Sequence, residues 1–501
     1  MLVQNTIKRS EMISCMLCMD APCNQVCDFF NPGDALRSIW FDNADVASLR
    51  LPEGNMCMSC NAPCERVCIS DDRIHIKSLM TELAWGVRSK AEIELPEDED
   101  RLKCDICGIP LENPFLLSSS VVASTYDMCA RAFEAGWAGA CFKTVCSLDI
   151  HEASPRFSAI TGDNGSIIGF KNIEQLSDHS VAENMKIFRK LKKNYPTKFI
   201  LASIMGQNEE EWESLARECA ENGADAIELN FSCPNMQEDG LGSDIGQVPE
   251  LVERFTRAAR RGASIPILAK LTPNVGTMSE AAEAAIRGGA DGIAAINTIK
   301  SIVGVNPLTF VSAPAVKGKS AIGGYSGNAV KPIALRFISE LGQNRKLKGK
   351  HISGMGGIET WRDALEFILM GAGSIQITTA VMQYGYRIID DLKSGLNYYL
   401  AQMGFSSVKD VIGAGLDSVS DTTDVLERDT VLFPSFNMDK CIGCGRCVIS
   451  CNDGGHQAIE FENRKPKLNG SKCVGCHLCL LVCPKGAIVP SKKRIYHKKD
   501  S

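Results

Sequence analysis

The stretch NGADAIELN (residues 222–230) decides the fold, because its sequence pattern is repeated in GGADGIAAIN (288–297) and MGAGSIQIT (370–378). In each copy, small residues stand directly before a short apolar run that is typical of a buried β-strand. Segments with helical periodicity, such as 209–222 and 279–288, fill the intervals between these runs. Strands and helices that alternate in this way favour a parallel sheet covered by helices.

Eight such units follow one another between residues 114 and 378. The expected strands cover residues 114–119, 140–144, 199–204, 226–231, 267–271, 292–297, 351–354 and 374–378. Eight units in a segment of this length match a TIM (β/α)8 barrel. An open, doubly wound sheet is the competing fold. Its dinucleotide-binding form is disfavoured, because no GxGxxG motif follows the first strand.

Composition and charge exclude several classes of protein. The chain has 501 residues, of which 45% are hydrophobic and 23% charged, as in an ordinary globular protein. Its 54 basic and 60 acidic side chains give a net charge of −6, which argues against nucleic-acid binding. No segment has the uninterrupted apolar length of a membrane-spanning helix. Residues 1–11 lack the apolar region of a signal peptide, so we expect a cytoplasmic protein.

The cysteines are concentrated at the two ends of the chain. There are 23 in all, and most of them fall into four tight groups. A long chain without a signal peptide keeps its thiols reduced and uses such groups to bind metal.

The two C-terminal groups repeat the cysteine run of bacterial ferredoxins. They read Cys441-x2-Cys444-x2-Cys447-x3-Cys451 and Cys473-x2-Cys476-x2-Cys479-x3-Cys483-Pro484. In modules with two such runs, the last cysteine of each run binds the cluster of the other run. We therefore expect one [4Fe-4S] cluster on Cys441, Cys444, Cys447 and Cys483, and another on Cys473, Cys476, Cys479 and Cys451. Structural zinc is the alternative.

The two N-terminal groups have a different spacing. They read Cys15-x2-Cys18-x4-Cys23-x3-Cys27 and Cys57-x2-Cys60-x3-Cys64-x3-Cys68. The strings CMLCMDAPCNQVC and CNAPCERVC resemble the N-terminal helical domain shared by glutamate synthase small subunits and dihydropyrimidine dehydrogenases, which holds two [4Fe-4S] clusters. The resemblance implies one cluster on Cys15, Cys18, Cys23 and Cys68, and a second on Cys27, Cys60 and Cys64. Zinc is again the alternative.

The fourth ligand of the second N-terminal cluster stays open. In the family it is a Gln or Glu that follows the last cysteine. The matching stretch of this chain, RIHIKSLMTELA (residues 73–84), has Met80 at that position. Cys57, Glu82 or another group could take this place.

Polar residues stand at the ends of the expected barrel strands, where barrel enzymes carry their active sites. The strings there include ELNFSCPN (228–235), which holds Asn230 and Cys233, and AKLTPN (269–274), which holds Lys270. Lys143 and Lys270 both stand at the ends of expected barrel strands, and two lysines at such positions indicate an anionic or electron-rich ligand. The glycines of GMGG (354–357), with a Thr-Thr pair after the last strand, predict a phosphate site, because glycine lets backbone N–H groups approach closely.

The strings NFSCPN, AKLTPN, AINT and YSGNAVKPIALR resemble the FMN barrel of dihydroorotate dehydrogenases that have a catalytic cysteine. Over residues 104–501 the chain is more similar to the pyrimidine-reducing half of dihydropyrimidine dehydrogenases and to their bacterial barrel-plus-ferredoxin subunit. The resemblance implies that Cys233 is the general acid/base. It implies FMN contacts from Ser118, Ser119, Lys143, Thr144, Lys270, Ser326, Gly327, Gly356, Gly357, Thr378 and Thr379. It implies pyrimidine contacts from Asn172, Glu174, Asn230, Asn297 and Thr298.

The expected architecture is therefore α/β with three domains. Residues 1–100 form a helical iron–sulfur domain. Residues 101–432 form an FMN-binding TIM barrel with a linker. Residues 433–501 form a ferredoxin-type domain with two [4Fe-4S] clusters.

The implied activity is interconversion of uracil or thymine with 5,6-dihydropyrimidines at FMN. An ordinary thiol has a pKa of about 8.5, so Cys233 could donate the proton at neutral pH. Because the chain lacks a Rossmann fingerprint, we expect electrons to come through the clusters from a FAD-containing, NAD(P)H-oxidising subunit or a ferredoxin. A homodimer or heterotetramer is expected. The alternatives are a dihydroorotate dehydrogenase-like enzyme and a non-catalytic electron-transfer module.

Overall fold

The computed structural model of the chain describes residues 12, 14–54, 56–72, 74–88, 91, 93–162, 166–236, 242–420 and 422–496. The segment 1–11, which is expected to lack a signal region, lies outside the described residues. The chain forms two compact units, which divide between Val419 and Ser420. In the part of the chain that is described, no helix has both the length and the apolar character needed to span a membrane.

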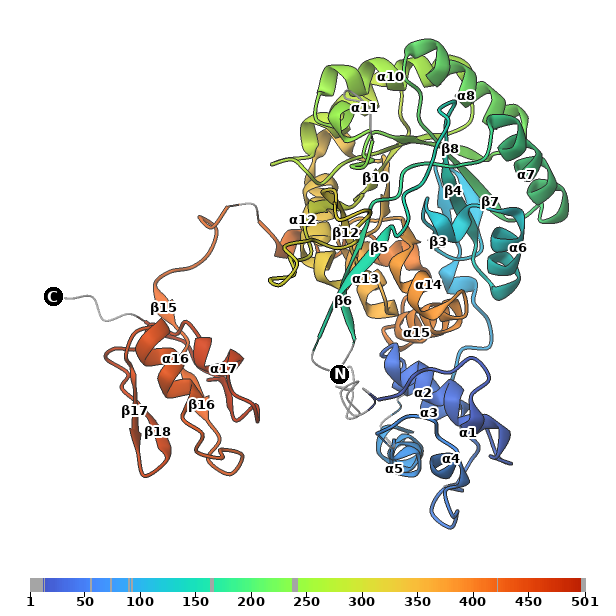
Figure 1. The fold of residues 1–501 in the computed structure, drawn as a ribbon. Helices are drawn as coiled ribbons and strands as arrows, with labels where there is room; N and C mark the ends of the chain where they lie inside the picture. Colours follow the sequence, from blue (N-terminus) through green and yellow to red (C-terminus); the bar gives the residue numbers. More distant parts are fainter. Residues whose placement is uncertain are drawn as a thin grey trace. The chain divides into compact units, whose positions relative to one another are not determined.

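Eight parallel strands close into a barrel (Figure 1), which confirms the TIM barrel and shows that the open sheet is wrong. Each expected strand is one of the eight. The strands are buried almost throughout, because both faces of a parallel sheet are covered. Around the barrel they follow in the order β10 (Gly292–Ala295), β13 (His351–Gly354), β14 (Ser374–Ile377), β3 (Phe115–Leu117), β4 (Gly139–Val145), β7 (Phe199–Ile204), β8 (Ala226–Asn230) and β9 (Ile267–Lys270).

Helices cover the outside of the barrel, and several begin at side chains that cap free backbone N–H groups. Ser180 and Glu183 form a capping box at the start of α7, and Thr360 and Asp363 form another at the start of α13. The helices are α6 (Tyr126–Ala135), α7 (Val181–Asn194), α8 (Glu209–Glu221), α9 (Ser243–Gly246), α10 (Pro249–Gly262), α11 (Ser279–Gly288), α12 (Lys331–Gln343), α13 (Trp361–Leu369), α14 (Thr379–Tyr384) and α15 (Ile388–Gln402).

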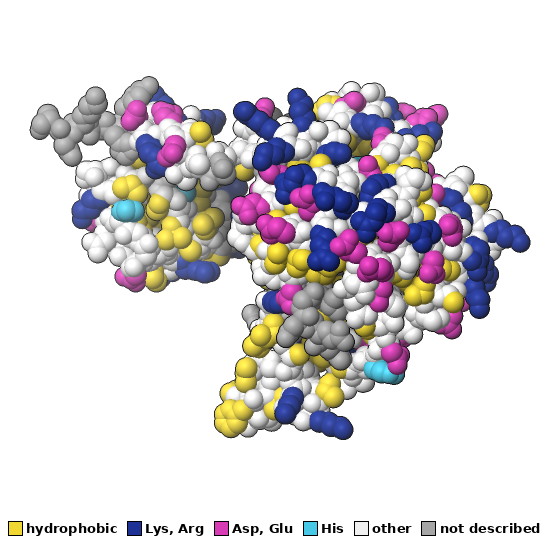
Figure 2. Space-filling view, turned by 90° about the horizontal axis from the view of Figure 1, so that it is seen from above, with side chains coloured by type: hydrophobic (Ala, Val, Ile, Leu, Met, Phe, Trp, Pro, Cys, Tyr) yellow, Lys and Arg dark blue, Asp and Glu magenta, His cyan; other side chains and the backbone are white. Residues whose placement is uncertain are grey.

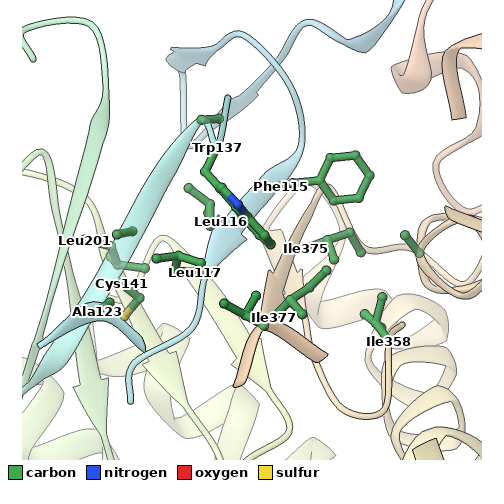
Figure 3. Close-up of a cluster of buried hydrophobic side chains, with 14 of the residues drawn as sticks. Phe115, Leu116, Leu117, Ala123, Trp137, Cys141, Leu201, Ile358, Ile375 and Ile377 are labelled. Atoms are coloured by element: carbon green, nitrogen blue, oxygen red, sulfur yellow. The ribbon is translucent and has the colours of Figure 1, made fainter. Parts of the chain in front are cut away.

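One part of the extended apolar core lies around the strands β3, β4 and β14 (Figure 3). Phe115, Leu116 and Leu117 of β3 are fully buried, and in Figure 3 they lie beside Ile375 and Ile377 of β14. Burial of a large apolar side chain stabilises a protein by roughly 1.5–3 kcal/mol. This packing fixes the carboxyl ends of the strands, from which the polar residues of the site project.

A small antiparallel sheet is formed by the segments that follow β4 and β10. Its strands run in the order β11 (Ile299–Ser301), β12 (Gly323–Ser326), β6 (Ile167–Asn172) and β5 (Phe157–Thr161). The sheet brings Asn172 and Ser326 to the same cavity, although neither lies on a barrel strand. A hairpin of β1 (Cys104–Ile106) and β2 (Ile109–Leu111) precedes the barrel.

Short helices at the N-terminus pack beside α15 (Figure 1). A buried ion pair joins the two parts, because Arg37 Nε donates to Asp391 Oδ2 over 2.8 Å. Ser38 Oγ donates to the other oxygen of Asp391, which is fully buried, over 2.6 Å. The helices are α1 (Pro22–Gln25), α2 (Pro32–Trp40), α3 (Ala44–Arg50), α4 (Pro63–Arg66) and α5 (Ile76–Glu82), which runs on into a π-helical turn (Leu83–Val87).

The described residues of the second unit form two short helices and three strand pairs. β16 (Pro434–Phe436) pairs with β19 (Ile488–Pro490), and β17 (Ile459–Glu462) pairs with β18 (Lys465–Leu468). Helix α16 (Arg446–Gly454) carries Cys447 and Cys451 of the first ferredoxin-like run, and α17 (Leu478–Leu481) carries Cys479 of the second, with Cys483 just beyond its end. The remaining pair is formed by β15 (Thr430–Val431) and β20 (Ile495–Tyr496).

The surface carries charges of both signs. On the face drawn in Figure 2, Lys and Arg side chains are interspersed with Asp and Glu. Neighbouring helices exchange ion pairs, as where Arg261 contacts Glu209 over 3.1 Å and Glu213 over 2.9 Å.

Candidate active site

A large cavity opens at the carboxyl ends of the barrel strands and spans about 1130 Å³, including the part open to solvent. Every barrel residue that the sequence predicted as a site residue lines it. From the strand ends come Ser118, Ser119, Lys143, Thr144, Asn230, Cys233, Lys270, Asn297, Thr298, Gly356, Gly357, Thr378 and Thr379, and from the small sheet and its loops come Asn172, Glu174, Ser326 and Gly327.

One side of the cavity is built from glycines and hydroxyl groups. Gly356 and Gly357, directly after β13, have φ angles of +125° and +80°, which side chains rarely adopt. Thr379 Oγ1 donates to Ser326 Oγ over 3.0 Å, and the hydroxyls of Thr378 and Ser120 are also 3.0 Å apart. These loops bring backbone N–H groups that a ligand can approach closely, together with several hydroxyl groups, to one wall of the cavity. Such a wall suits a phosphate.

Lys143, at the end of β4, is buried between two carboxylates. Its Nζ lies 3.4 Å from Glu152 and 3.4 Å from Glu174. Arg156 also reaches Glu174, over 3.2 Å. Burial raises the pKa of Glu174, and the Lys143 and Arg156 cations oppose that rise. The positive charges of Lys143 and Arg156 therefore balance the negative charges of Glu152 and Glu174 in this part of the cavity.

The positive charge of Lys270, at the end of β9, is also balanced by a buried carboxylate. Its Nζ lies 3.4 Å from Glu228, whose side chain is fully buried, and 3.4 Å from Ser118 Oγ. Gln376 Nε2 donates to the other carboxylate oxygen of Glu228 over 3.1 Å. Among the described residues, Gln376 Oε1 is buried without a hydrogen-bond partner, and Gln376 lines the cavity. A ligand group in the cavity could satisfy it.

The amide side chains form a connected network. Asn230 Nδ2 donates to Thr144 Oγ1 over 2.9 Å, and Asn297 Nδ2 donates to Ser232 Oγ over 2.8 Å. Ser232 Oγ in turn donates to Asn230 Oδ1, so Ser232 links the two amides. Across the cavity, Asn235 Nδ2 donates to Asn172 Oδ1 over 3.1 Å. Asn235 Oδ1 has no partner among the described residues.

Cys233 lines the same cavity and is buried, with 6% of its surface exposed. Burial raises the pKa of its thiol to about 11. The thiol therefore stays protonated at neutral pH, as a proton donor requires.

The C-terminal thiols gather around two cavities. Cys441, Cys444, Cys447 and Cys483 line one, and Cys451, Cys473, Cys476 and Cys479 line the other. These are the sets expected from the crossover rule. Across the described residues, no three His, Cys, Asp or Glu side chains lie close enough to hold a single metal ion.

The N-terminal thiols also form two groups. Cys15, Cys18, Cys23 and Cys68 line a cavity of about 590 Å³, which Arg37 and Arg387 also line. Arg387 Nη1 donates to the Cys18 carbonyl over 3.2 Å, so the barrel holds this loop directly. Cys27, Cys57, Cys60 and Cys64 form the second group, in which the thiols interact electrostatically with one another.

Residues 101–400 match the dihydroorotate dehydrogenase family model. The chain belongs to the dihydroorotate dehydrogenase family. A further model, the 4Fe-4S dicluster domain, matches residues 435–489, so this family member carries an iron–sulfur domain that follows the barrel in the sequence. The expected fold class is confirmed.

Several relatives refine this placement within the dihydroorotate dehydrogenase family. The chain is 53% identical over 363 residues (72% of this chain, 88% of the relative) to the NAD-dependent dihydropyrimidine dehydrogenase subunit PreA of Escherichia coli K12. It is 37% identical over 345 residues (66% and 81%) to the chloroplastic dihydropyrimidine dehydrogenase (NADP(+)) of Arabidopsis thaliana. It is 37% identical over 319 residues (63% and 99%) to the catalytic subunit of dihydroorotate dehydrogenase B (NAD(+)) of Pyrococcus abyssi. The resemblance to dihydropyrimidine dehydrogenases is confirmed, and the chain is an oxidoreductase of this type.

Sequence reasoning missed several residues of this family member's site. Glu228 stands in an otherwise apolar strand, and that interruption was a signal that could have identified it. Ser232 and Asn235 flank Cys233 in a string that was already singled out. Glu152 lies in a loop, and no local pattern indicates that it faces Lys143.

Proposed function

We propose that this chain interconverts uracil or thymine with the 5,6-dihydropyrimidines at an FMN in the barrel cavity. The supporting observation is that a protonated thiol, a network of amides and a glycine- and hydroxyl-rich wall meet in one cavity. The bacterial and plant relatives are named as dihydropyrimidine dehydrogenases. The reduction delivers a hydride to C6 of the pyrimidine and a proton to C5, and the C5–C6 double bond becomes a single bond.

The cavity residues fit FMN. The wall of Gly356, Gly357, Ser326, Thr378 and Thr379 would hold its phosphate, through backbone N–H groups and hydroxyls. The unpartnered Gln376 Oε1 can accept a hydrogen bond from the flavin ring, and Lys143 and Lys270 would place positive charge beside it. Bound FMN supplies the hydride.

Gly357→Ala should weaken FMN binding about tenfold or more. A Cβ at this position would lie 2.8 Å from the backbone N of Lys331 and 2.9 Å from the carbonyl O of Gly327, so the phosphate wall must move. A strained residue of this kind costs about 1–3 kcal/mol, and 1.4 kcal/mol is about tenfold in affinity. Flavin fluorescence on titration of apoprotein with FMN measures the change.

Gly349→Ala is the matched control, because Gly349 also has a φ of +80° but its Cβ would meet no atom within 4 Å. This variant carries the backbone strain without the crowding and should bind FMN as the unsubstituted protein does. Equal FMN affinities of the two variants would contradict the assignment of the phosphate wall.

Cys233 and the amides act on the pyrimidine. The Cys233 thiol donates a proton to C5, and the thiolate is then reprotonated from solvent. Asn172, Asn230 and Asn297, with Glu174 and Thr298, are placed to bind the alternating C=O and N–H groups at the edge of the pyrimidine. Both donors and acceptors are needed along that edge, and amide side chains supply both.

The charges at the cavity favour a neutral pyrimidine over orotate. Orotate carries a carboxylate, which needs a cation without a partner. Lys143 is held by Glu152 and Glu174, and Lys270 is held by Glu228, so each lysine of the described cavity wall is already compensated. An added carboxylate would lie close to these buried acids, and like charges repel strongly in a low-dielectric site.

Electrons are proposed to reach FMN through [4Fe-4S] clusters. The two C-terminal thiol sets and the set of Cys15, Cys18, Cys23 and Cys68 surround cavities where such clusters would bind. The E. coli relative is named as a subunit. We infer that a FAD-containing subunit oxidises NAD(P)H and donates to this chain, in a heterotetramer or around a homodimer; a ferredoxin is the alternative donor.

Mixing the reduced protein with candidate substrates tests the proposal. Anaerobic protein reduced with dithionite is mixed with uracil, thymine or orotate, the flavin absorbance is followed, and the products are identified by mass spectrometry. Uracil or thymine should reoxidise the flavin and yield the 5,6-dihydro product. Reoxidation by orotate alone would establish the dihydroorotate alternative, and no reoxidation by any of the three would indicate an electron-transfer module.

A further inference from the structure

The second N-terminal thiol group holds four cysteines, one more than the resemblance implied. Cys27 follows α1, and Cys64 lies in α4, which packs against α1. The other two, Cys57 and Cys60, stand at either end of the turn that precedes α4. These elements bring thiols from two distant stretches of sequence to one place.

Cys57 is held within this group. The Cys60 backbone N–H donates to the Cys57 carbonyl over 3.2 Å, which closes the turn between them. The Cys57 thiol interacts electrostatically with the thiols of Cys60 and Cys27, and the Cys64 thiol interacts with those of Cys27 and Cys57. Each of the four thiols therefore lies near at least one other thiol of the group. The Cys57 thiol lies near those of Cys27, Cys60 and Cys64.

The other candidates for the fourth ligand face elsewhere. Met80 is 1% exposed and belongs to the apolar core. Glu82 is exposed, and its carboxylate lies over Gly86 of the following turn, where an added Cβ would be only 2.0 Å from Glu82 Oε1.

A cation stands beside the four thiols. Lys77 Nζ donates to the Cys60 carbonyl over 2.8 Å, and its charge acts on the Cys57 thiol. The Lys77 backbone N–H is held in turn by Glu65 Oε1 over 2.8 Å, which ties α5 to α4. A cluster held by four thiolates carries more negative charge than one held by three, and Lys77 is placed to offset it.

We propose that the second N-terminal [4Fe-4S] cluster is held by four cysteines, Cys27, Cys57, Cys60 and Cys64, with Cys57 in the place that a Gln or Glu takes in the resembled domain. This rests on the proposal that the N-terminal domain carries clusters. A fourth thiolate makes the site symmetric in ligand type, as in most [4Fe-4S] centres.

Cys57→Ser tests the assignment in the full-length protein. Iron and sulfide are counted after anaerobic reconstitution, and EPR spectra are recorded after reduction. The unsubstituted protein should hold about 16 iron atoms per chain. Cys57→Ser should lose between about one and four of them, as a three-iron cluster or an empty site. Cys27→Ser should show a loss in the same range, and the double variant should lose no more than about four iron atoms, because both residues bind one cluster.

Two controls keep the test specific. Glu82→Ala, which removes the ligating group altogether, and Cys107→Ser, at a half-buried cysteine of the barrel hairpin, should keep the full iron content. Full iron and an unchanged EPR spectrum in Cys57→Ser, or iron loss in Glu82→Ala, would overturn the assignment. About 8 iron atoms in the unsubstituted protein would also overturn it. None of these results depends on pyrimidine turnover, which is measured separately by flavin reoxidation.

Discussion

Cys233→Ala should slow reoxidation of the reduced flavin by uracil by about 10²–10⁴-fold, the usual contribution of a positioned general acid. The thiol lines the same cavity as the pyrimidine-binding amides and is kept protonated by burial. FMN content should stay unchanged, because the phosphate wall lies on other loops. Anaerobic stopped-flow spectroscopy with dithionite-reduced protein measures the rate.

Cys146→Ala is the matched control. Cys146 is buried near Cys233 but does not line the cavity, so its removal should leave the rate within about twofold. The pH dependence gives a second check. Because the pKa of the Cys233 thiol is about 11, the proton donor is intact at lower pH, and pyrimidine reduction should stay level from pH 7 to 9 and fall only as the thiol ionises. A fully active Cys233→Ala variant would refute the proton-donor role.

Lys270→Met should destabilise the barrel by about 3–5 kcal/mol, because it leaves a buried carboxylate without its cation. Glu228 is fully buried, and its ion pair with Lys270 is flanked by Gln376. The shift of the urea unfolding midpoint, followed by tryptophan fluorescence, measures the loss.

The double variant Glu228→Gln/Lys270→Met should recover most of this stability, since no unpaired charge remains. It should not recover the activity, because the cation beside the flavin is still missing. Lys192→Met is the control. Its partner Asp225 lies 2.8 Å away in a partly exposed pair, whose loss should cost less than about 1 kcal/mol. Equal destabilisation by Lys192→Met and Lys270→Met would contradict the buried-pair argument.

The barrel was predictable because each of its strands has a local signal in the sequence. Buried parallel strands read as short apolar runs, so all eight could be placed from sequence, and their polar ends indicated the cavity. The polar residues at the carboxyl ends of the strands, such as Lys143 and Asn297, could be identified from this rule alone. Asn172 and Glu174 needed the family resemblance, because they lie on or just after β6, a strand outside the barrel.

The remaining features depend on contacts that no local pattern encodes. Glu152 meets Lys143 only through the folded loop that follows β4. The pairing of β6 with β12 joins segments about 150 residues apart, and it brings Asn172 and Ser326 to one cavity. Spacing could not choose Cys57 over Glu82, because the choice rests on how the turn before α4 folds onto α1.

The most direct test of the central claim, that iron–sulfur clusters feed pyrimidine reduction at the barrel cavity, is to count the product formed by fully reduced protein. The protein is reduced with titanium(III) citrate, freed of reductant and mixed anaerobically with excess uracil, and dihydrouracil is quantified. Two electrons on the flavin and one on each of four clusters predict about three molecules of dihydrouracil per chain. About one molecule per chain, with the clusters still reduced, would contradict the account, and so would consumption of orotate without consumption of uracil.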